Sequence, residues 1–403
     1  MQPQLTSGDF WGADPHSALT WLRANEPVYW DPAGGVWGLT RYADVRTASL
    51  HPELYSSAGG IRPETPATPM MIDQDDPQHL LRRRLISKGF TPRRVADLRP
   101  RIDQITHALI DRVCERGACE FVGAIAAWLP LIVIGDQLGV EPARYDDLLR
   151  WSDDMMAVQG QRADPVLTGR MTTALVEYRE YFAGVLADRR AGNSDDLIGV
   201  LVRAEVEGER LDDEMLYFDS LLLLIGGDET TRHVITGGLY QLLVEPERWE
   251  RLRGDRSLLP SAIEEMLRWV SPIRNMARTL TRDLTLRGRE LTAGQKVLLL
   301  YPSANRDEDV FADPFRFDLA RTPNNHLAFG VGSHFCLGSS LARLELEAVF
   351  AALLDRLPDL RLAEPAEPRL RPAMFVSGYE ELSVAFTPTA PLGVAPRLRT
   401  RGR

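Results

Sequence analysis

Between about residues 78 and 270, apolar residues recur at spacings of three and four, which is the period of an amphipathic α-helix. Stretches such as FTP, GVEP and GNSDD interrupt this pattern and are typical of places where one helix ends and another begins. The pattern therefore predicts a helical body.

The longest uninterrupted helical pattern covers residues 211–243, LDDEMLYFDSLLLLIGGDETTRHVITGGLYQLL. Asp residues at its start suit a helix N-terminus, and Pro246 follows its end. At about 1.5 Å per residue, a helix of this length crosses a whole domain. We expect it to be the central helix of the fold.

Shorter patterns near both ends of the chain predict strands. The first 60 residues mix aromatic and apolar pieces, such as VYWDPAGGVWGLTRY, with Gly and Pro, which indicates a small sheet and connecting helices. After Met276, TLTRDLTLRGRELTAGQKVLLL alternates between apolar and polar residues, and FVSGYEELSVAF predicts a hairpin. The expected fold class is mainly α with small β-sheets.

Composition limits the class of protein. With 44% hydrophobic and 26% charged residues, the chain matches an ordinary globular protein. A length of 403 residues would allow two or three domains, but no linker, low-complexity tract or repeat divides it. We expect one domain over residues 1–393, followed by a basic, disordered tail at 394–403.

The net charge of −10 argues against wholesale binding to nucleic acid or anionic lipid. No apolar run is long enough to span a bilayer, and the N-terminus lacks the pattern of a signal peptide, so we expect a cytoplasmic protein. Three cysteines cannot all pair, which fits a reducing compartment. Cys114 and Cys119 are expected to be free thiols without a chemical role.

The segment HLAFGVGSHFCLGSSLARLELEAVF is the most informative for chemistry. Cys336 lies between glycines and just before a helical pattern, where backbone N–H groups and the helix N-terminus would favour a thiolate. The glycines would let the main chain approach a flat ligand. A lone Cys in this position can also be structural.

Three other sites receive no support from the motifs. Gly330 and Gly332 lack the third glycine of a dinucleotide-binding fingerprint, and no GxxxxGK[ST] motif occurs. The seven His residues show no HExxH spacing, and the cysteines show no CxxC spacing. Neither a nucleotide loop nor a zinc site is expected.

From Phe329 to Gly338, the pattern Phe-Gly-x-Gly-x-His-x-Cys-x-Gly resembles the haem-binding loop of the cytochrome P450 superfamily at every fixed position. The resemblance implies a long central helix over haem b and the Cys loop beneath it. It makes Cys336 the axial thiolate ligand of iron, which favours O–O cleavage. It also implies that Phe329, Gly330 and Gly338 contact the cofactor.

The long helical pattern contains a Gly-Gly-Asp-Glu-Thr-Thr stretch from Gly226 to Thr231. Paired glycines cost about 1 kcal/mol each relative to Ala, and a helix-packing notch would be one reason to keep them. The resemblance implies another reason, a bulge that leaves room for dioxygen and water. Glu229 would then supply protons through water and Thr230 would hydrogen-bond the oxygen, whereas Asp228 and Thr231 would be structural.

Glu265 and Arg268 lie three residues apart on one predicted helix face and alone would be a surface pair. The resemblance implies instead a buried network with Arg316 that holds the Cys loop. His79 and Arg83 would alone be a solvated basic face. The resemblance makes them ligands of the haem propionates, together with the residues Arg278 and His334.

Further basic residues surround that segment, namely Arg82, Arg84, Lys88, Arg93 and Arg94. They indicate either a solvated face or a docking surface for an acidic electron carrier. The resemblance implies that dioxygen is the co-substrate and that electrons come from NAD(P)H through a ferredoxin and its reductase.

Within the superfamily, GGIRPETPATPMMIDQDDPQHLLRRRL and AIEEMLRWVSPIRNMARTLT are most similar to actinobacterial steroid side-chain hydroxylases. Those enzymes oxidise C-26 or C-27 of cholesterol or cholest-4-en-3-one and can continue to the carboxylic acid. Residues that could line an apolar pocket are Met71, Ile72, Leu222, Ile225, Gly226, Ile273, Met276 and Phe375. The same spacings also arise from ordinary core packing.

The sequence is also compatible with other substrates and functions. The substrate could be another lipid, such as a fatty acid or a terpenoid. Peroxide-using fatty-acid hydroxylases of this fold usually replace the acid and alcohol pair, whereas Glu229 and Thr230 are present here. A haem-binding sensor without turnover would have no use for that pair. We expect a monomer.

Overall fold

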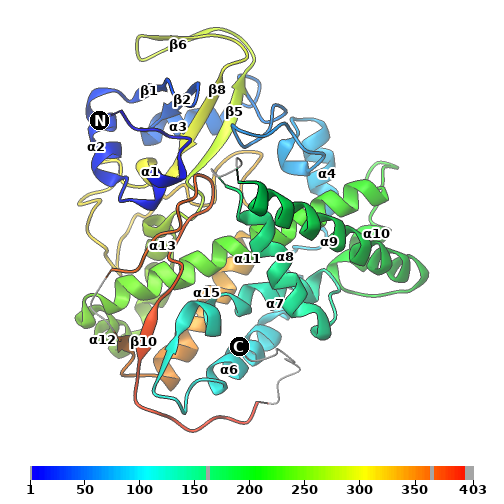
Figure 1. The fold of residues 1–403 in the computed structure, drawn as a ribbon, viewed down its shortest axis with the longest axis vertical. Coiled ribbons are helices and arrows are strands. Elements are labelled where there is room, and N and C mark those ends of the chain that lie inside the picture. Colours follow the sequence, from blue (N-terminus) through cyan, green and yellow to red (C-terminus); the bar gives the residue numbers. More distant parts are fainter. Residues whose placement is uncertain (1, 160–163, 364–366, 395–403) are drawn as a thin grey trace.

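The computed structural model describes residues 2–159, 164–363 and 367–394. Helices make up most of the described chain, and the long α11 runs through the middle of the helical part (Figure 1). The α-helices are α1 Gly8–Gly12, α2 His16–Asn25, α3 Tyr42–Leu50, α4 Gln78–Ser87, α5 Pro92–Asp97, α6 Arg99–Asp111, α7 Trp128–Gln137, α8 Tyr145–Met156, α9 Pro165–Ala191, α10 Leu197–Arg203, α11 Asp213–Leu243, α12 Pro246–Gly254, α13 Leu259–Val270, α14 Tyr301–Ala304 and α15 Ser339–Arg356. Short 3-10 turns lie at η1 Met71–Asp73, η3 Pro142–Arg144 and η4 Arg256–Leu258, and a π-helical turn lies at η2 Val122–Ala126.

Three small sheets accompany the helices. The largest has the strand order β1-β2-β8-β5-β3 and lies with α1, α2 and α3 at one end of the molecule (Figure 1). The other two have the orders β4-β10-β9 and β6-β7. The strands are β1 Val28–Asp31, β2 Val36–Leu39, β3 Tyr55–Ser56, β4 Ala118–Glu120, β5 Asn275–Leu280, β6 Leu284–Leu286, β7 Arg289–Leu291, β8 Lys296–Leu300, β9 Arg361–Leu362 and β10 Ser383–Ala385. The fold class expected from the sequence, mainly α with small sheets, is confirmed.

The helix expected over residues 211–243 is α11, which begins two residues later than its sequence pattern. The Asp212 side chain caps it by accepting a hydrogen bond from the backbone N–H of Met215. Gly238 lies against α13, where an added Cβ would be 2.7 Å from the sulfur of Met266. The glycine therefore allows the two helices to pack closely.

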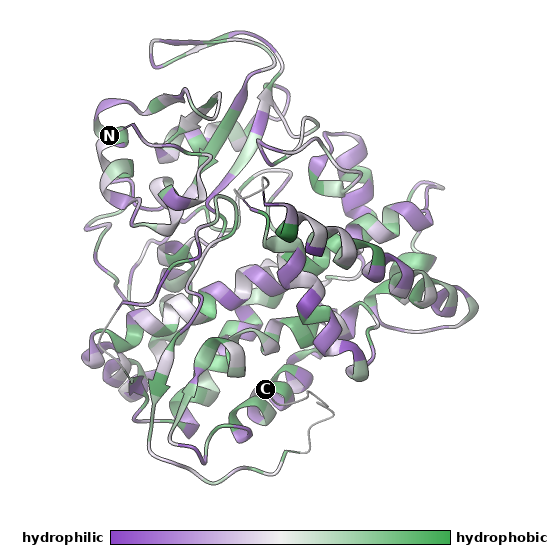
Figure 2. Cartoon of the chain, viewed as in Figure 1, coloured by the Kyte–Doolittle hydropathy of each residue, from purple (hydrophilic) through white to green (hydrophobic). Residues whose placement is uncertain are grey.

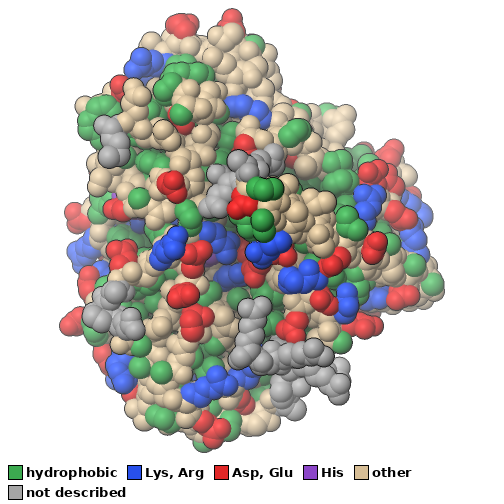
Figure 3. Space-filling model, in the orientation of Figure 1, with side chains coloured by type: hydrophobic (Ala, Val, Ile, Leu, Met, Phe, Trp, Pro, Cys, Tyr) green, Lys and Arg blue, Asp and Glu red, His purple; other side chains and the backbone are tan. Residues whose placement is uncertain are grey.

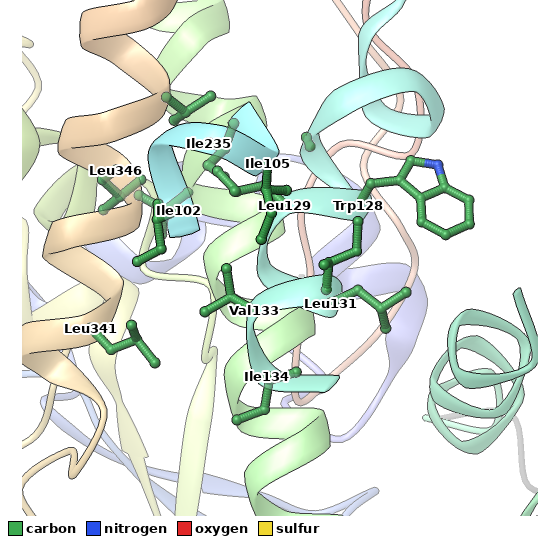
Figure 4. Close-up of a cluster of buried hydrophobic side chains, with 14 of the residues drawn as sticks. Ile102, Ile105, Trp128, Leu129, Leu131, Val133, Ile134, Ile235, Leu341 and Leu346 are labelled. Carbon is green, nitrogen blue, oxygen red and sulfur yellow. The ribbon is translucent and has the colours of Figure 1, made fainter. Parts of the chain in front are cut away.

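The main hydrophobic core lies where α6, α7, α11 and α15 meet (Figure 4). Ile105, Leu129, Ile235 and Leu346 are fully or almost fully buried there. The colouring by hydropathy shows apolar and polar residues mixed along the helices (Figure 2), and α7 is buried over nearly its whole length. This core holds α11 and α15 in fixed positions on the two sides of the cavity described below.

The C-terminal part of the chain differs from the sequence-based expectation in the pairing of β10. The hairpin predicted for FVSGYEELSVAF is wrong, because β10 pairs with β4 and β9 rather than with the neighbouring residues. Alternation of apolar and polar residues marks a strand but does not identify its partner. Of the predicted basic tail, residues 395–403 lie outside the described residues.

Cys114 is buried, Cys119 lies half-buried on β4, and both are free thiols. Burial raises the pKa of the Cys119 thiol to about 12, so this thiol stays protonated and unreactive at neutral pH. Within the described ranges, no helix is long and apolar enough to cross a membrane.

Candidate active site

A cavity between α11 and the loop before α15 contains about 1560 Å³ of space between protein atoms, part of it open to solvent. Gly226 and Thr230 line one side from α11, and Cys336 and Gly338 line the other. Ile134 of α7 and Leu341 of α15, both labelled in Figure 4, connect the cavity wall to the main core. The central helix and the Cys loop thus face the same space.

The Cys loop is shaped by backbone hydrogen bonds and glycines. The N–H of Cys336 donates to the carbonyl of Phe329 at 2.8 Å, which closes the loop. Gly330 and Gly332 have φ angles of +67° and +83°, and a Cβ on Gly332 would lie 2.7 Å from the carbonyl oxygen of Ser49. Only glycine fits Gly332 without displacing the backbone of α3. The loop therefore presents Cys336 at the floor of the cavity, accessible from the cavity side.

Opposing effects act on the pKa of the Cys336 thiol. Burial raises its pKa above the ordinary value, although a hydrogen bond from the Gly338 amide and the charges of Arg83 and Arg343 offset part of this effect. The physical reason is that desolvation of a thiolate outweighs the partial charge of one helix end. A bound cation would reverse the balance, because a metal-coordinated thiol is deprotonated.

Two histidines and two arginines, all able to donate hydrogen bonds, line the cavity. They are His79 and Arg83 of α4, Arg278 of β5, and His334 of the Cys loop. The rings of His79 and His334 stack with their centroids 3.9 Å apart. Burial, together with Arg278 and His79, lowers the pKa of His334 to about 2. The structure brings together all four residues that the resemblance selected.

Arg278 forms no ion pair within the described parts of the chain. It is almost fully buried, and among the described residues its side chain forms a hydrogen bond only to the carbonyl of Ala277. A buried guanidinium without a counter-ion is costly, and carboxylates of a bound cofactor would supply one. Gly226 and Gly338 face empty space, since a Cβ on either would meet no atom within 4 Å. These features fit a flat cofactor with carboxylate groups, such as haem.

The Gly-Gly pair of α11 serves two purposes. Gly226 lines the cavity, whereas a Cβ on Gly227 would lie 3.1 Å from Cγ1 of Ile134 on α7, so Gly227 is a packing notch. The helix is continuous through both glycines, and the expected bulge is not present. Room for a ligand instead comes from the missing side chain of Gly226. The hydroxyl of Thr230 donates to the carbonyl of Gly226 at 2.6 Å and lines the cavity.

Glu229 points away from the cavity that Thr230 lines. It is fully buried and pairs with Arg371 at 2.8 Å and with Arg232 at 3.2 Å, while His233 lies 3.5 Å away. Burial alone would raise the pKa of Glu229, but Arg232 and Arg371 hold it well below the ordinary value. The carboxylate is therefore ionised and held behind the helix, which the sequence did not indicate.

A second buried acid, Glu345, does line the cavity. It lies on α15 one turn after Leu341, and Thr231 of α11 donates a hydrogen bond to it. Burial, and to a lesser extent Asp228, raises the pKa of Glu345 well above its ordinary value, which favours its neutral form. Thr231 also lines the cavity, contrary to the expectation that it is purely structural. The helical spacing from Leu341 could have indicated Glu345.

Six of the eight residues suggested for an apolar pocket line the cavity. The other two, Ile225 and Phe375, belong to a cluster behind the wall, where they pack with Ile72, Ile273 and Met276. Ile225 lies on α11 and Phe375 on the loop before β10, and an apolar residue type does not show whether a side chain reaches the cavity or packs behind its wall. The wall residues are Met71, Ile72, Leu222, Gly226, Ile273 and Met276.

The buried network around Glu265 has a different third member from the one expected. Glu265 pairs with Arg268 at 2.7 Å and with Arg321 at 3.0 Å. The Arg316 side chain is exposed, and only its carbonyl takes part, as an acceptor for Arg268 and Arg321. The assignment of Arg316 is therefore wrong, because the loop after α14 brings Arg321 rather than Arg316 against α13.

The basic residues near α4 do not form one surface. Arg82 is buried and pairs with Asp219 of α11, so it cannot belong to a docking surface. Arg84 and Lys88 are exposed and reach Glu207 and the carbonyl of Glu205. Of these residues, only the exposed ones, such as Arg84 and Lys88, could contact an electron carrier.

Comparisons with known proteins agree with this geometry. A model of the family described as Cytochrome P450 matches residues 171–360. The Steroid C26-monooxygenase of Mycolicibacterium smegmatis is 52% identical over 389 residues, covering 96% of this chain and 97% of that protein. The Methyl-branched lipid omega-hydroxylase of Mycobacterium tuberculosis is 37% identical, covering 95% of this chain and 94% of that protein.

Among solved structures, CYP109E1 from Bacillus megaterium in complex with testosterone matches with a TM-score of 0.87 and 34% identity, covering 94% of this chain and 99% of that one. The fold, the cavity and these matches define an oxygenase that works with haem, dioxygen and electrons from a redox partner. The chain belongs to the cytochrome P450 family and is a monooxygenase.

Proposed function

We propose that the protein hydroxylates a terminal methyl group of a steroid side chain, at C-26 or C-27 of cholesterol or cholest-4-en-3-one, and can continue to the carboxylic acid. The observation that carries this proposal is the 52% identity, over nearly the whole chain, to the Steroid C26-monooxygenase of Mycolicibacterium smegmatis. The apolar wall of the cavity suits such a substrate. A methyl-branched lipid is a second candidate, because of the 37% identity to the omega-hydroxylase.

We assign Cys336 as the residue whose thiolate would bind the iron of haem b. The residues His79, Arg83, Arg278 and His334 would bind the propionates, and Phe329, Gly330 and Gly338 would contact the cofactor. When bound, haem supplies the redox chemistry that activates dioxygen and transfers one of its oxygen atoms to a C–H bond. The Glu265, Arg268 and Arg321 network supports the chain that leads into the Cys loop.

We assign proton delivery to Thr230 and Glu229. The Thr230 hydroxyl can hold a proton at the cavity surface, next to the space left by Gly226. Glu229, ionised and paired with the partly exposed Arg371, can accept protons from the outside and pass them on through water. This role requires Glu229 to lengthen its contact with Arg371, since the carboxylate does not line the cavity.

We also propose that electrons come from NAD(P)H through a ferredoxin and its reductase. The exposed cationic residues Arg84, Lys88 and Arg93 offer a surface that suits an acidic carrier. The free thiols Cys114 and Cys119 fit a reducing compartment, the cytoplasm. We take the active species to be a monomer.

The first test is a titration of the purified ferric protein with cholest-4-en-3-one, followed by absorption, with a long-chain fatty acid as the control. We expect a low-to-high-spin shift at micromolar sterol, and a red-shifted carbonyl band typical of thiolate ligation after reduction under carbon monoxide. A thiolate band without a sterol response would reject the steroid. NADH oxidation that depends on sterol and yields product, measured with a surrogate ferredoxin and reductase, separates an enzyme from a haem sensor.

A further inference from the structure

A buried carboxylate in the first half of α11, Asp219, has no part in the functions assigned above. It is only 1% exposed. One of its oxygens accepts the backbone N–H of Met71 at 2.9 Å, and the other accepts from Nε of Arg82 at 2.6 Å. Arg82 in turn donates to the carbonyl of Met215, one turn earlier on α11. Asp219 therefore connects α11 to Met71 and to Arg82, which lie 148 and 137 residues earlier in the chain.

These three segments all contribute to the cavity. Met71 is a wall residue. Asp219 precedes Leu222 and Leu223 by three and four residues, so it lies on the same face of α11 as these two wall residues. Arg82 lies beside Arg83 on α4, which also carries His79. The contacts of Asp219 thus fix the wall at Met71 relative to both the central helix and α4.

The segment before Met71 is held at its other end by a separate set of contacts. The N–H of Ile61 and the N–H and hydroxyl of Thr68 donate to Asp73, and the carbonyl of Ile61 accepts from the N–H of Ala277 on β5. Residues 66–69, which include Thr68, are exposed, whereas Met71 is buried in the main core and Asp73 is buried beside it. Packing therefore holds Met71 inside the protein, and Asp219 adds the hydrogen bond that joins its backbone to α11.

A buried ion pair is weak evidence for stability, since an apolar pair of similar volume is often equally stable. An apolar pair, however, could not accept the N–H of Met71 and hold it at one distance from α11. We propose that Asp219 is a positioning residue for the substrate: it fixes the wall at Met71 and so restricts which carbon of a long apolar chain reaches the space above Cys336. This inference rests on the proposed function, in which the carbon oxidised is the terminal one.

The test compares three variants in the full-length holoprotein. Asp219→Ala removes both contacts. Asp219→Asn keeps an acceptor for Met71 but loses the charge opposite Arg82. The matched control is Ser220→Ala, because Ser220 is equally buried on the next position of α11 but bonds to Tyr178 of α9 and to Tyr217, away from the cavity.

Two iron ligands separate effects on the wall from effects on the haem. Imidazole reaches only the iron, whereas 1-dodecylimidazole also fills the cavity along its wall. For Asp219→Ala we expect 1-dodecylimidazole to bind about tenfold more weakly with imidazole unchanged, as the loss of a hydrogen bond to a charged group would produce. We expect Asp219→Asn to change in the same direction by less, and Ser220→Ala to match the wild type.

With sterol as substrate, we expect the product of Asp219→Ala to spread from the terminal carbon to neighbouring carbons of the side chain. The inference would be overturned if both Asp219 variants kept the wild-type product pattern and the wild-type ratio of 1-dodecylimidazole affinity to imidazole affinity. An equal change in Ser220→Ala would also overturn it. If Asp219→Ala does not fold, the Asn variant decides by the same criteria. If the wild type binds no sterol, the substrate proposal fails, and the 1-dodecylimidazole ratio still tests Asp219.

Discussion

The hydroxyl of Thr230 donates to the carbonyl of Gly226, and both residues line the cavity. Glu229, the neighbour of Thr230, lies behind the helix in ion pairs with Arg371 and Arg232. The alcohol and the acid are thus separated by the helix backbone. A proton that passes between them must travel through water or follow a rotation of the Glu229 side chain.

Replacing Thr230 by Ala is expected to uncouple the reaction. Without the hydroxyl, reduced oxygen leaves as peroxide, so the product formed per NADH falls by about tenfold or more while NADH oxidation continues. The measurement is the ratio of hydroxylated sterol to NADH consumed, together with the peroxide released. The matched control is Thr236→Ala, since Thr236 makes the same hydrogen bond one turn back, to Arg232, but is fully buried in the core. Unchanged coupling in Thr230→Ala would contradict the assignment of this residue.

At the scale of elements, the contact between α11 and α13 depends on missing side chains. Gly238 faces Met266, whose Sδ, Cγ and Cβ would all lie within 3.2 Å of an added Cβ. Such overpacking displaces a side chain or a helix and typically costs about 1–3 kcal/mol. The position of α11 above the cavity is set in part by this contact.

Gly238→Ala is therefore expected to lower the stability of the protein, although Ala is the better helix former by about 1 kcal/mol. The matched control is Gly169→Ala on α9, where the added Cβ meets no atom within 4 Å and stability should rise. Thermal unfolding of both variants measures the difference. A Tm for Gly238→Ala at or above that of Gly169→Ala would contradict this prediction. It would show that α13 can move away from the added methyl group without loss of stability.

The sequence predicted those elements whose signals are local. The apolar period and the Asp residues located α11 to within two residues, and the Cys loop was recognisable because its glycines and Cys336 lie within ten residues. The partner of β10 was not predictable, since β4 is about 260 residues earlier in the chain. Arg321 was missed in favour of Arg316 for a related reason: a loop without periodicity does not reveal which arginine turns inward. Arg371 was missed too, because its contact with Glu229 joins positions 142 residues apart.

At the scale of the whole molecule, acidic and basic side chains are interspersed over the face seen in Figure 3. With a net charge of −10, the protein repels an acidic partner at long range. Productive docking of an acidic electron carrier therefore needs a local basic surface. Arg84 and Lys88 are candidates, because both are exposed and lie at the end of α4, the helix whose Arg83 contacts the Cys loop.

Arg84→Glu is expected to slow reduction of the haem by a ferredoxin severalfold, with less effect at high salt. Stopped-flow reduction at two ionic strengths measures this change. Peroxide-driven turnover should be preserved, because the cavity is unchanged. The control is Arg361→Glu on β9, another exposed arginine in an ion pair, which should leave the reduction rate as it is. Equal losses with ferredoxin and with peroxide would mean that Arg84 acts on the fold rather than on docking.

The contact between Arg83 and the Phe335 carbonyl joins positions 252 residues apart, one on α4 and the other beside Cys336. During synthesis the N-terminal part of the chain emerges from the ribosome first and begins to fold. The half of the site on α4 is then made long before the Cys loop exists. Because Phe335 comes 252 residues after Arg83, haem can contact both halves of the site only after most of the chain has been translated.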